Sequence, residues 1–139
     1  MAGGSIAKGV SFQKANADIN SESIRAVEVR ASKMNRSDSR NLWLHRAVAR
    51  MLQRDPENTI ALARRNLSRM LAQHPRSRVY LEKWSEILSL SADRIADVLC
   101  SPSQDARDLR SCSPFAGALT ESQRLVELKA FREHWLESR

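Results

Sequence analysis

The sequence contains few residues that interrupt or cross-link a chain. It has four glycines and four prolines in 139 residues, which disfavours a turn-rich β fold and favours long helices. Its two cysteines, Cys100 and Cys112, form no Cys-x-x-Cys pair and have no histidine or further cysteine at metal-binding spacing. We expect two free thiols in a reducing compartment, and a disulfide across the short intervening segment is the alternative.

Signals for membranes and for export are also lacking. No run of 18 apolar residues occurs, so we expect no membrane-spanning helix and no membrane partner. The first residues, MAGGSIAKGVSFQ, lack the apolar core of a signal peptide. These features favour a cytoplasmic protein.

Motifs of the common enzyme classes are missing from the chain. There is no Gly-x-Ser-x-Gly, no His-Glu-x-x-His, no phosphate-binding glycine loop and no dinucleotide-binding glycine pattern. The three histidines, His45, His74 and His134, are far apart and fall in no recognised pattern. Acidic pairs in the second half have helical spacing, which is typical of solvated faces. We therefore predict no enzymatic activity, no catalytic or metal-binding residues and no cofactor.

The composition fits one folded domain with a loose end. Apolar residues make up 42% of the chain, enough for a core without disulfides or metal. The net charge of +7 is unevenly placed. Residues 1–78 carry 15 Lys and Arg against 6 Asp and Glu, whereas residues 79–139 carry 8 against 10. A basic first half and a mildly acidic second half indicate a polyanionic partner for the first, either nucleic acid or an acidic protein surface.

Apolar residues recur at three- and four-residue steps along most of the chain. The pattern predicts an all-α, compact bundle of five to seven helices in a single domain over 21–139, preceded by a disordered tail over 1–20. The expected helices are 21–34, 39–54, 56–73, 77–90, 92–99, 104–110 and one from about 120 to the C-terminus. In the helix 77–90 the expected buried residues are Tyr80, Leu81, Trp84, Ile87 and Leu88.

Two helix starts have strong local signals. Asp55 is a good N-cap, and Pro56 suits the first helical position because its missing N–H costs nothing there. Thr120 and Gln123 form the pattern of a capping box. Between 111 and 119 the chain reads as a compact loop with one large apolar residue, Phe115, which we expect to plug the core.

Arginines line the faces of the helices on either side of Asp55-Pro56. Arg46, Arg50 and Arg54 follow one another at four-residue spacing, and Arg65 and Arg69 do the same on the next helix. Guanidinium groups bind phosphate or carboxylate through paired, salt-sensitive hydrogen bonds. We predict that these five arginines bind nucleic acid or an acidic partner. The alternative is that they only solvate helix faces.

A second set of residues suggests a protein interface. The expected first helix carries an apolar stripe that includes Ile24, Val27 and Ala31, and it could pack on another protein as an arm. Trp43 falls off the main apolar stripe of its helix, so it either reaches a neighbouring helix or anchors a partner. Residues 86–99 loosely resemble a helix-turn-helix, but Asp93 and Asp97 on its second helix would repel phosphate.

Several segments resemble those of small helical bacterial proteins that are encoded beside toxin genes and act as antitoxins or regulators. The resemblance covers about residues 42–132 and is carried by five segments: 44–49 (LHRAVA), 55–56 (DP), 63–67 (ARRNL), 109–110 (LR) and 113–117 (SPFAG). It implies a non-enzymatic protein that binds a toxin and can also regulate its own operon. The chain departs from the common design of this group, because its N-terminus lacks a helix-turn-helix and its first half is basic.

These observations lead to one main functional hypothesis and one alternative. We predict a bacterial antitoxin-like protein that binds and neutralises a partner protein, using the arm, Trp43 and the arginines of 39–54. The alternative is a DNA- or RNA-binding regulator that uses the same arginines and has no protein target. The sequence leaves self-association open.

Overall fold

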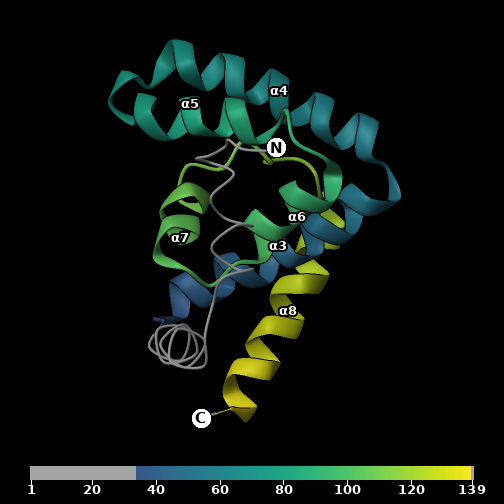
Figure 1. The fold of residues 1–139 in the computed structure, drawn as a ribbon. Helices are drawn as coiled ribbons and strands as arrows, with labels where there is room; N and C mark the ends of the chain where they lie inside the picture. The colour runs from purple at the N-terminus through teal and green to yellow at the C-terminus, as the bar shows by residue number, and fades with distance from the viewer. Residues whose placement is uncertain (1–33, 139) are drawn as a thin grey trace, which may run out of the picture.

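Six α-helices and one 3₁₀ turn make up residues 34–138, the part of the chain that the computed structural model describes (Figure 1). No strand occurs in this part, which confirms the predicted all-α bundle. The expected tail and the helix predicted at 21–34 lie outside the described residues. The helices are α3 (Arg36–Arg54), α4 (Pro56–Gln73), α5 (Arg78–Ile87), α6 (Ala92–Cys100), α7 (Gln104–Arg110) and α8 (Glu121–Glu137), with the turn η1 (Pro75–Ser77) before α5.

Helix α3 is the element against which most of the others pack. It contacts α4, α6, α7 and α8. Helices α4 and α5 run side by side at the end of the molecule that lies away from α8 (Figure 1). The core between these helices is built from aliphatic residues around Trp84, whose side chain is fully buried. Its other members include Val48, Leu52, Ala63, Leu67, Leu81, Ile95, Leu99, Leu109 and Phe115.

The predicted helix starts with strong signals are confirmed. The Asp55 side chain accepts a hydrogen bond from the Asn58 N–H, and Pro56 opens α4. At α8, the Thr120 hydroxyl accepts from the Gln123 N–H at 3.1 Å while the Gln123 side chain accepts from the Thr120 N–H at 2.8 Å. Both caps use donors and acceptors only three residues apart, so short sequence patterns suffice to find them.

Two details of the predicted helices are wrong. The expected break at 35–38 is the first turn of α3, because Asn35 caps the helix by accepting from the Asp38 N–H at 2.8 Å. Tyr80, expected in the core, is 41% exposed. Helix α5 packs mainly on α4, and the side that it turns inward carries Leu81, Trp84 and Leu88, which leaves Tyr80 on the flank.

The segment between α7 and α8 is held in place by side chains from other helices. Phe115 is buried, as predicted, and its ring meets the Trp84 ring edge-on at 5.8 Å. The Trp84 indole N–H donates to the Leu109 carbonyl at 2.9 Å. On the other side, the buried Asn66 amide donates to the carbonyls of Pro114 and Ala116 at 2.8 and 2.9 Å. The two Asn66 bonds satisfy carbonyls in a segment that has no helix or strand to supply their donors.

A tight turn reverses the chain within this segment. The Ala118 N–H donates to the Phe115 carbonyl at 3.0 Å, and Gly117 has a φ of 89°. A turn with positive φ at its third residue favours glycine, since side chains with a Cβ rarely adopt that conformation. A Cβ added at Gly117 would have a methyl group of Leu62 as its nearest neighbour, at 4.0 Å. The constraint at Gly117 is therefore conformational and not steric crowding by neighbours.

Two basic side chains are buried near this segment. Burial lowers the pKa of His45 to about 4, and the charge of Arg110 acts in the same direction, whereas its hydrogen bond to the Asn41 carbonyl opposes the change. Arg110 is 2% exposed and donates to the Ser101 carbonyl at 2.6 Å, next to the C-terminus of α6. A cation at this helix end is favourable because the free carbonyls carry partial negative charge.

We predict that Asn66→Ala lowers the free energy of unfolding by about 2–3 kcal/mol, because it leaves two carbonyls of a buried segment without donors. The measurement is urea denaturation followed by circular dichroism. Ser68→Ala, an exposed change on the same helix, is the control and should stay within about 0.5 kcal/mol of the parent protein. A loss below about 0.5 kcal/mol for Asn66→Ala would show that the segment does not depend on this amide.

The buried imidazole of His45 should make stability depend on pH. The unfolded chain takes up a proton near pKa 6.5 and the folded chain only near 4, so the unfolded state binds more protons between these values. Stability is therefore complete above pH 6.5 and falls by about 3 kcal/mol as the pH drops through this window.

Urea denaturation at pH 7 and at about pH 4.5 tests this for the parent protein and for His45→Gln. The variant should lose much less stability than the parent between the two values. His74→Gln, a change at an exposed histidine, should keep the parent's pH dependence. If His45→Gln keeps it as well, another group is responsible.

Candidate partner-binding surface on helices α3 and α8

The three arginines predicted on one face of α3 do lie along one side of that helix, but α8 covers part of it. The Arg50 guanidinium forms an ion pair with Glu127 of α8 at 3.1 Å. The Arg50 side chain is 63% exposed and the Glu127 side chain 23% exposed, so water screens this pair and its contribution to stability is small. Arg46 and Arg54 are exposed and have no carboxylate within 4 Å among residues 34–138.

Trp43 reaches a neighbouring helix, which is one of its two predicted roles. Its indole N–H donates to the second carboxylate oxygen of Glu127 at 3.0 Å. Its ring lies 5.8 Å from the Phe131 ring and 5.1 Å from the His134 ring, measured between centroids. Glu127 therefore joins Trp43 and Arg50, and this pairing fixes how α8 sits on α3. The role of Trp43 as a partner anchor stays a prediction.

The predicted arginines of α4 face other surroundings. Arg69 donates to the side-chain oxygen of Asn66, which holds the segment after α7. The neighbouring Arg64 donates to the Leu88 carbonyl at 3.0 Å. Arg65 is exposed and, in the described chain, has no carboxylate within 4 Å. The five predicted arginines of α3 and α4 therefore do not form one continuous basic surface that is free to bind a partner, because Arg50 and Arg69 are bound to other side chains of the protein.

The outward side of α8 carries a stripe that sequence reasoning did not single out. Leu125, Lys129, Arg132 and Leu136 follow one another at steps of four, three and four residues and are all exposed. Leu125 is 55% exposed and Leu136 is 59% exposed, while Phe131 on the opposite side is buried. We call these four residues the α8 outer stripe. The signal for it was present in the spacing, but the same leucines also fit a buried face.

An aromatic groove lies on the inner flank of α8. It has a volume of about 460 Å³ and is walled by Trp43, Phe131 and Trp135, with Arg46 at its side. Met34, the first described residue, also lines it. The apolar residues predicted as partner contacts in the preceding segment, Ile24, Val27 and Ala31, lie outside the described residues.

Residues 86–99, which loosely resemble a helix-turn-helix, present an acidic surface in the structure. Four residues of α6 are buried, and α6 packs against α3. Its exposed side chains are Asp93, Arg94 and Asp97, two acids against one base. This surface would repel phosphate on balance, as the two acids in the sequence indicate.

Residues 34–138 show no features of a metal site, a membrane-spanning helix or a reactive thiol. Within residues 34–138, no three His, Cys, Asp or Glu side chains are grouped so that they could hold a metal ion. No helix of that range has the length and hydropathy to cross a membrane. Cys100 and Cys112 are free thiols, and burial raises the pKa of both. A raised pKa keeps a thiol protonated and so unreactive at neutral pH.

No family model, curated protein or solved structure matches the chain. Its function is therefore inferred from the surface itself.

We predict that Glu127→Ala loosens the contact between α3 and α8, because it removes the acceptor of both Trp43 and Arg50. The loss of a hydrogen bond to a charged acceptor should lower the free energy of unfolding by about 1–2 kcal/mol. Tryptophan fluorescence should also shift to longer wavelength as Trp43 gains solvent. Glu133→Ala, an exposed change on the same helix, is the control and should alter neither quantity. Unchanged fluorescence and stability in Glu127→Ala would contradict this role.

Proposed function

We propose that the protein is a non-enzymatic, antitoxin-like binding protein that neutralises a partner protein by covering it with α8 and the adjoining side of α3. The observation that supports this most is the α8 outer stripe. A helix that packs on the core through one side usually has a polar opposite side. Here two leucines more than half exposed stand in line with Lys129 and Arg132.

The spacing of this stripe fits a helix that lies in a groove of another protein. Such helices contact the partner through residues three, four and seven positions apart. Leu125 and Leu136 are 55% and 59% exposed, so burial of their remaining surface contributes about 2–3 kcal/mol to association before the costs of ordering. Lys129 and Arg132 between them would face carboxylates. The partner is therefore expected to offer an apolar groove with an acidic rim.

The flank of α8 can extend the interface. The aromatic groove beside Trp43 and Trp135 would receive an apolar side chain of the partner, and Arg46 at its side would pair with an acidic group. Aromatic residues and arginine are the types that contribute most at protein interfaces. In this arrangement Arg46 acts as predicted from the sequence, whereas Arg50 serves to hold α8.

Nucleic-acid binding is the second candidate and rests on a different observation. Arg46, Arg54 and Arg65 are exposed and have no carboxylate partner in the described chain. Phosphate contacts of this kind weaken steeply with salt, whereas an apolar contact does not. Arg50→Glu is a poor test, because it would place two carboxylates together beside α8. Arg54→Glu and Arg65→Glu remove basic charge without disturbing a known contact.

The test is co-expression with the protein encoded beside this chain's gene, followed by growth measurement and affinity purification after nuclease treatment. We expect the chain to restore growth and to retain that protein at both about 0.1 and 1 M salt, since screening at the higher value removes mainly charge contacts. Leu125→Asp should weaken the complex by at least about tenfold, because it places a charge where a leucine is buried.

Ser68→Asp adds an acid to the exposed side of α4, away from α8, and should leave the complex unchanged. A chain that retains only nucleic acid, loses it as salt rises and binds it less in Arg54→Glu would favour the regulator instead. A neighbouring protein that is harmless and does not bind would contradict neutralisation.

A further inference from the structure

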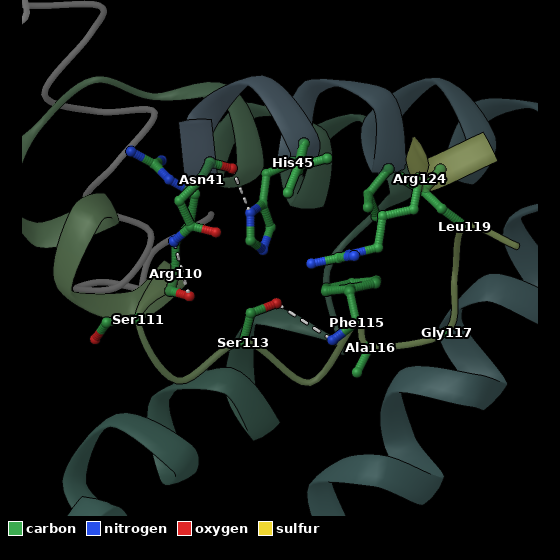
Figure 2. A pocket seen from close by; sticks show the side chains of 12 residues that line it. Asn41, His45, Arg110, Ser111, Ser113, Phe115, Ala116, Gly117, Leu119 and Arg124 are labelled. Carbon is green, nitrogen blue, oxygen red and sulfur yellow. Dashed lines mark hydrogen bonds between the residues drawn. The ribbon is translucent and has the colours of Figure 1, made fainter. Parts of the chain in front are cut away.

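A separate cavity lies between α3, the segment after α7 and the first turns of α8 (Figure 2). Its volume is about 320 Å³, at the lower end of the range for sites that bind small molecules. It does not overlap the α8 outer stripe or the aromatic groove. Its lining consists of Asn41, Leu44, His45, Val48, Arg110, Ser111, Ser113, Phe115, Ala116, Gly117, Leu119 and Arg124.

The lining combines apolar and basic residues. Leu44, Val48, Phe115 and Leu119 supply the apolar wall. The polar residues include two arginines and no acid. Small-molecule sites usually combine an apolar wall with a few converging polar groups, and this cavity has that character. A lining with positive charge and no carboxylate favours an anion.

His45 presents an unused acceptor to the cavity. It is 7% exposed, and its Nδ1 lies 2.8 Å from the Asn41 carbonyl, which can only accept, so Nδ1 carries the proton. The imidazole is neutral at pH 7, since burial lowers its pKa to about 4. Nε2 therefore holds a lone pair, has no hydrogen-bond partner in the described chain and points between Ser113 and Arg124 (Figure 2).

Two donors face this lone pair across the cavity. The Arg124 guanidinium points inward from α8 toward His45, and no carboxylate of the described chain lies within 4 Å of it (Figure 2). The Ser113 oxygen accepts from the Phe115 N–H at 3.2 Å, which leaves its own hydrogen free to donate. The two donors and the acceptor come from three different segments and converge on one space.

Arg110 adds positive charge on the other side of His45 from Arg124 (Figure 2). One guanidinium nitrogen of Arg110 is bound to carbonyls at the end of α6, while Nε and the other nitrogen are buried without a hydrogen-bond partner among the described residues. Burial lowers the pKa of Arg110 to about 10, so it stays charged at neutral pH. A buried cation that is only partly neutralised by carbonyls raises the local positive potential.

We propose that this cavity binds a small organic carboxylate that has an apolar body and a hydroxyl group beside the carboxylate. The carboxylate would accept from Arg124 and Ser113. The hydroxyl would donate to Nε2 of His45, and the apolar body would rest on Leu44, Val48 and Phe115.

The polar groups favour a carboxylate over a phosphate. A phosphate ester presents three acceptor oxygens, and the bare Nε2 of His45 would repel any of them that is not protonated. A carboxylate has two oxygens, which match the guanidinium of Arg124 in a paired contact. The site is also preformed, since Asn66 and Phe115 hold the segment that carries Ser113. A preformed site does not spend binding energy on ordering a loop.

The test uses mandelate and 2-hydroxyisocaproate, two hydroxy acids with apolar bodies, as probes of the full chain. Titration calorimetry should show saturable binding of at least one of them. In long-range ¹⁵N spectra of the parent protein, the signal of His45 Nε2 should move on binding while Nδ1 stays protonated. Arg124→Gln should weaken binding at least tenfold, since it removes the charged donor.

Matched probes and a matched variant separate the parts of the proposal. Phenylacetate, which lacks the hydroxyl, should bind at least fivefold more weakly than mandelate, and benzyl alcohol, which lacks the carboxylate, should not bind. Arg132→Gln changes an arginine on the outer side of α8 and should bind like the parent. Both variants alter exposed side chains, and circular dichroism would show that they fold.

Three results would overturn the proposal. The first is that neither hydroxy acid binds saturably below about 10 mM, which corresponds to a binding free energy of only about 3 kcal/mol. The second is that Arg124→Gln binds the hydroxy acids as tightly as the parent protein does. The third is that inorganic phosphate binds as tightly as mandelate. None of these depends on the partner protein, so the failure of this site and of the proposed function can be told apart.

Discussion

The carbonyl groups of the partly buried segment between α7 and α8 need hydrogen-bond donors from other parts of the chain. The segment has no regular structure, so its carbonyls cannot bond within a helix, and burial without donors would cost about 1–3 kcal/mol each. Asn66 supplies two of these donors, and Trp84 supplies one to the Leu109 carbonyl just before the segment. Phe115 seals the contact against Trp84. Because α8 begins directly after this segment, the same bonds decide where α8 starts and in which direction it runs.

The attachment of α8 is narrow, and this explains its exposed apolar surface. Among its residues only Phe131 is buried, and the contact with α3 depends on that side chain, Trp43 and the acceptor Glu127. A helix held along one line leaves most of its circumference in solvent. Leucines on the free side contribute little to the fold of this chain, because more than half of the surface of each is exposed. Contact with a second molecule is the situation in which their burial would contribute to stability, and this connects the fold to the proposed function.

Local signals in the sequence predicted much of the fold, and long-range pairings account for what they missed. The cap at Asp55, the capping box at Thr120 and the bounds of α4 depend on residues a few positions apart, so they could be read directly. The exposure of Tyr80 could not, because it depends on which side of α5 meets α4. The same holds for Arg50, whose partner Glu127 lies 77 positions later. A periodic pattern identifies a face of a helix but not the element that covers it.

Residues from three separate segments, 44–49, 63–67 and 109–110, meet around the segment 113–117. Asn66 of 63–67 binds the backbone of 113–117. His45 of 44–49 and Arg110 of 109–110 line the cavity beside that segment. Each of these three residues is buried, and each is bound to a backbone carbonyl. Removing any one of these side chains would leave a backbone carbonyl without its side-chain donor or ring partner. These residues thus form one structural unit around the segment after α7, and the α8 outer stripe, which shares none of them, is a separate feature of the surface.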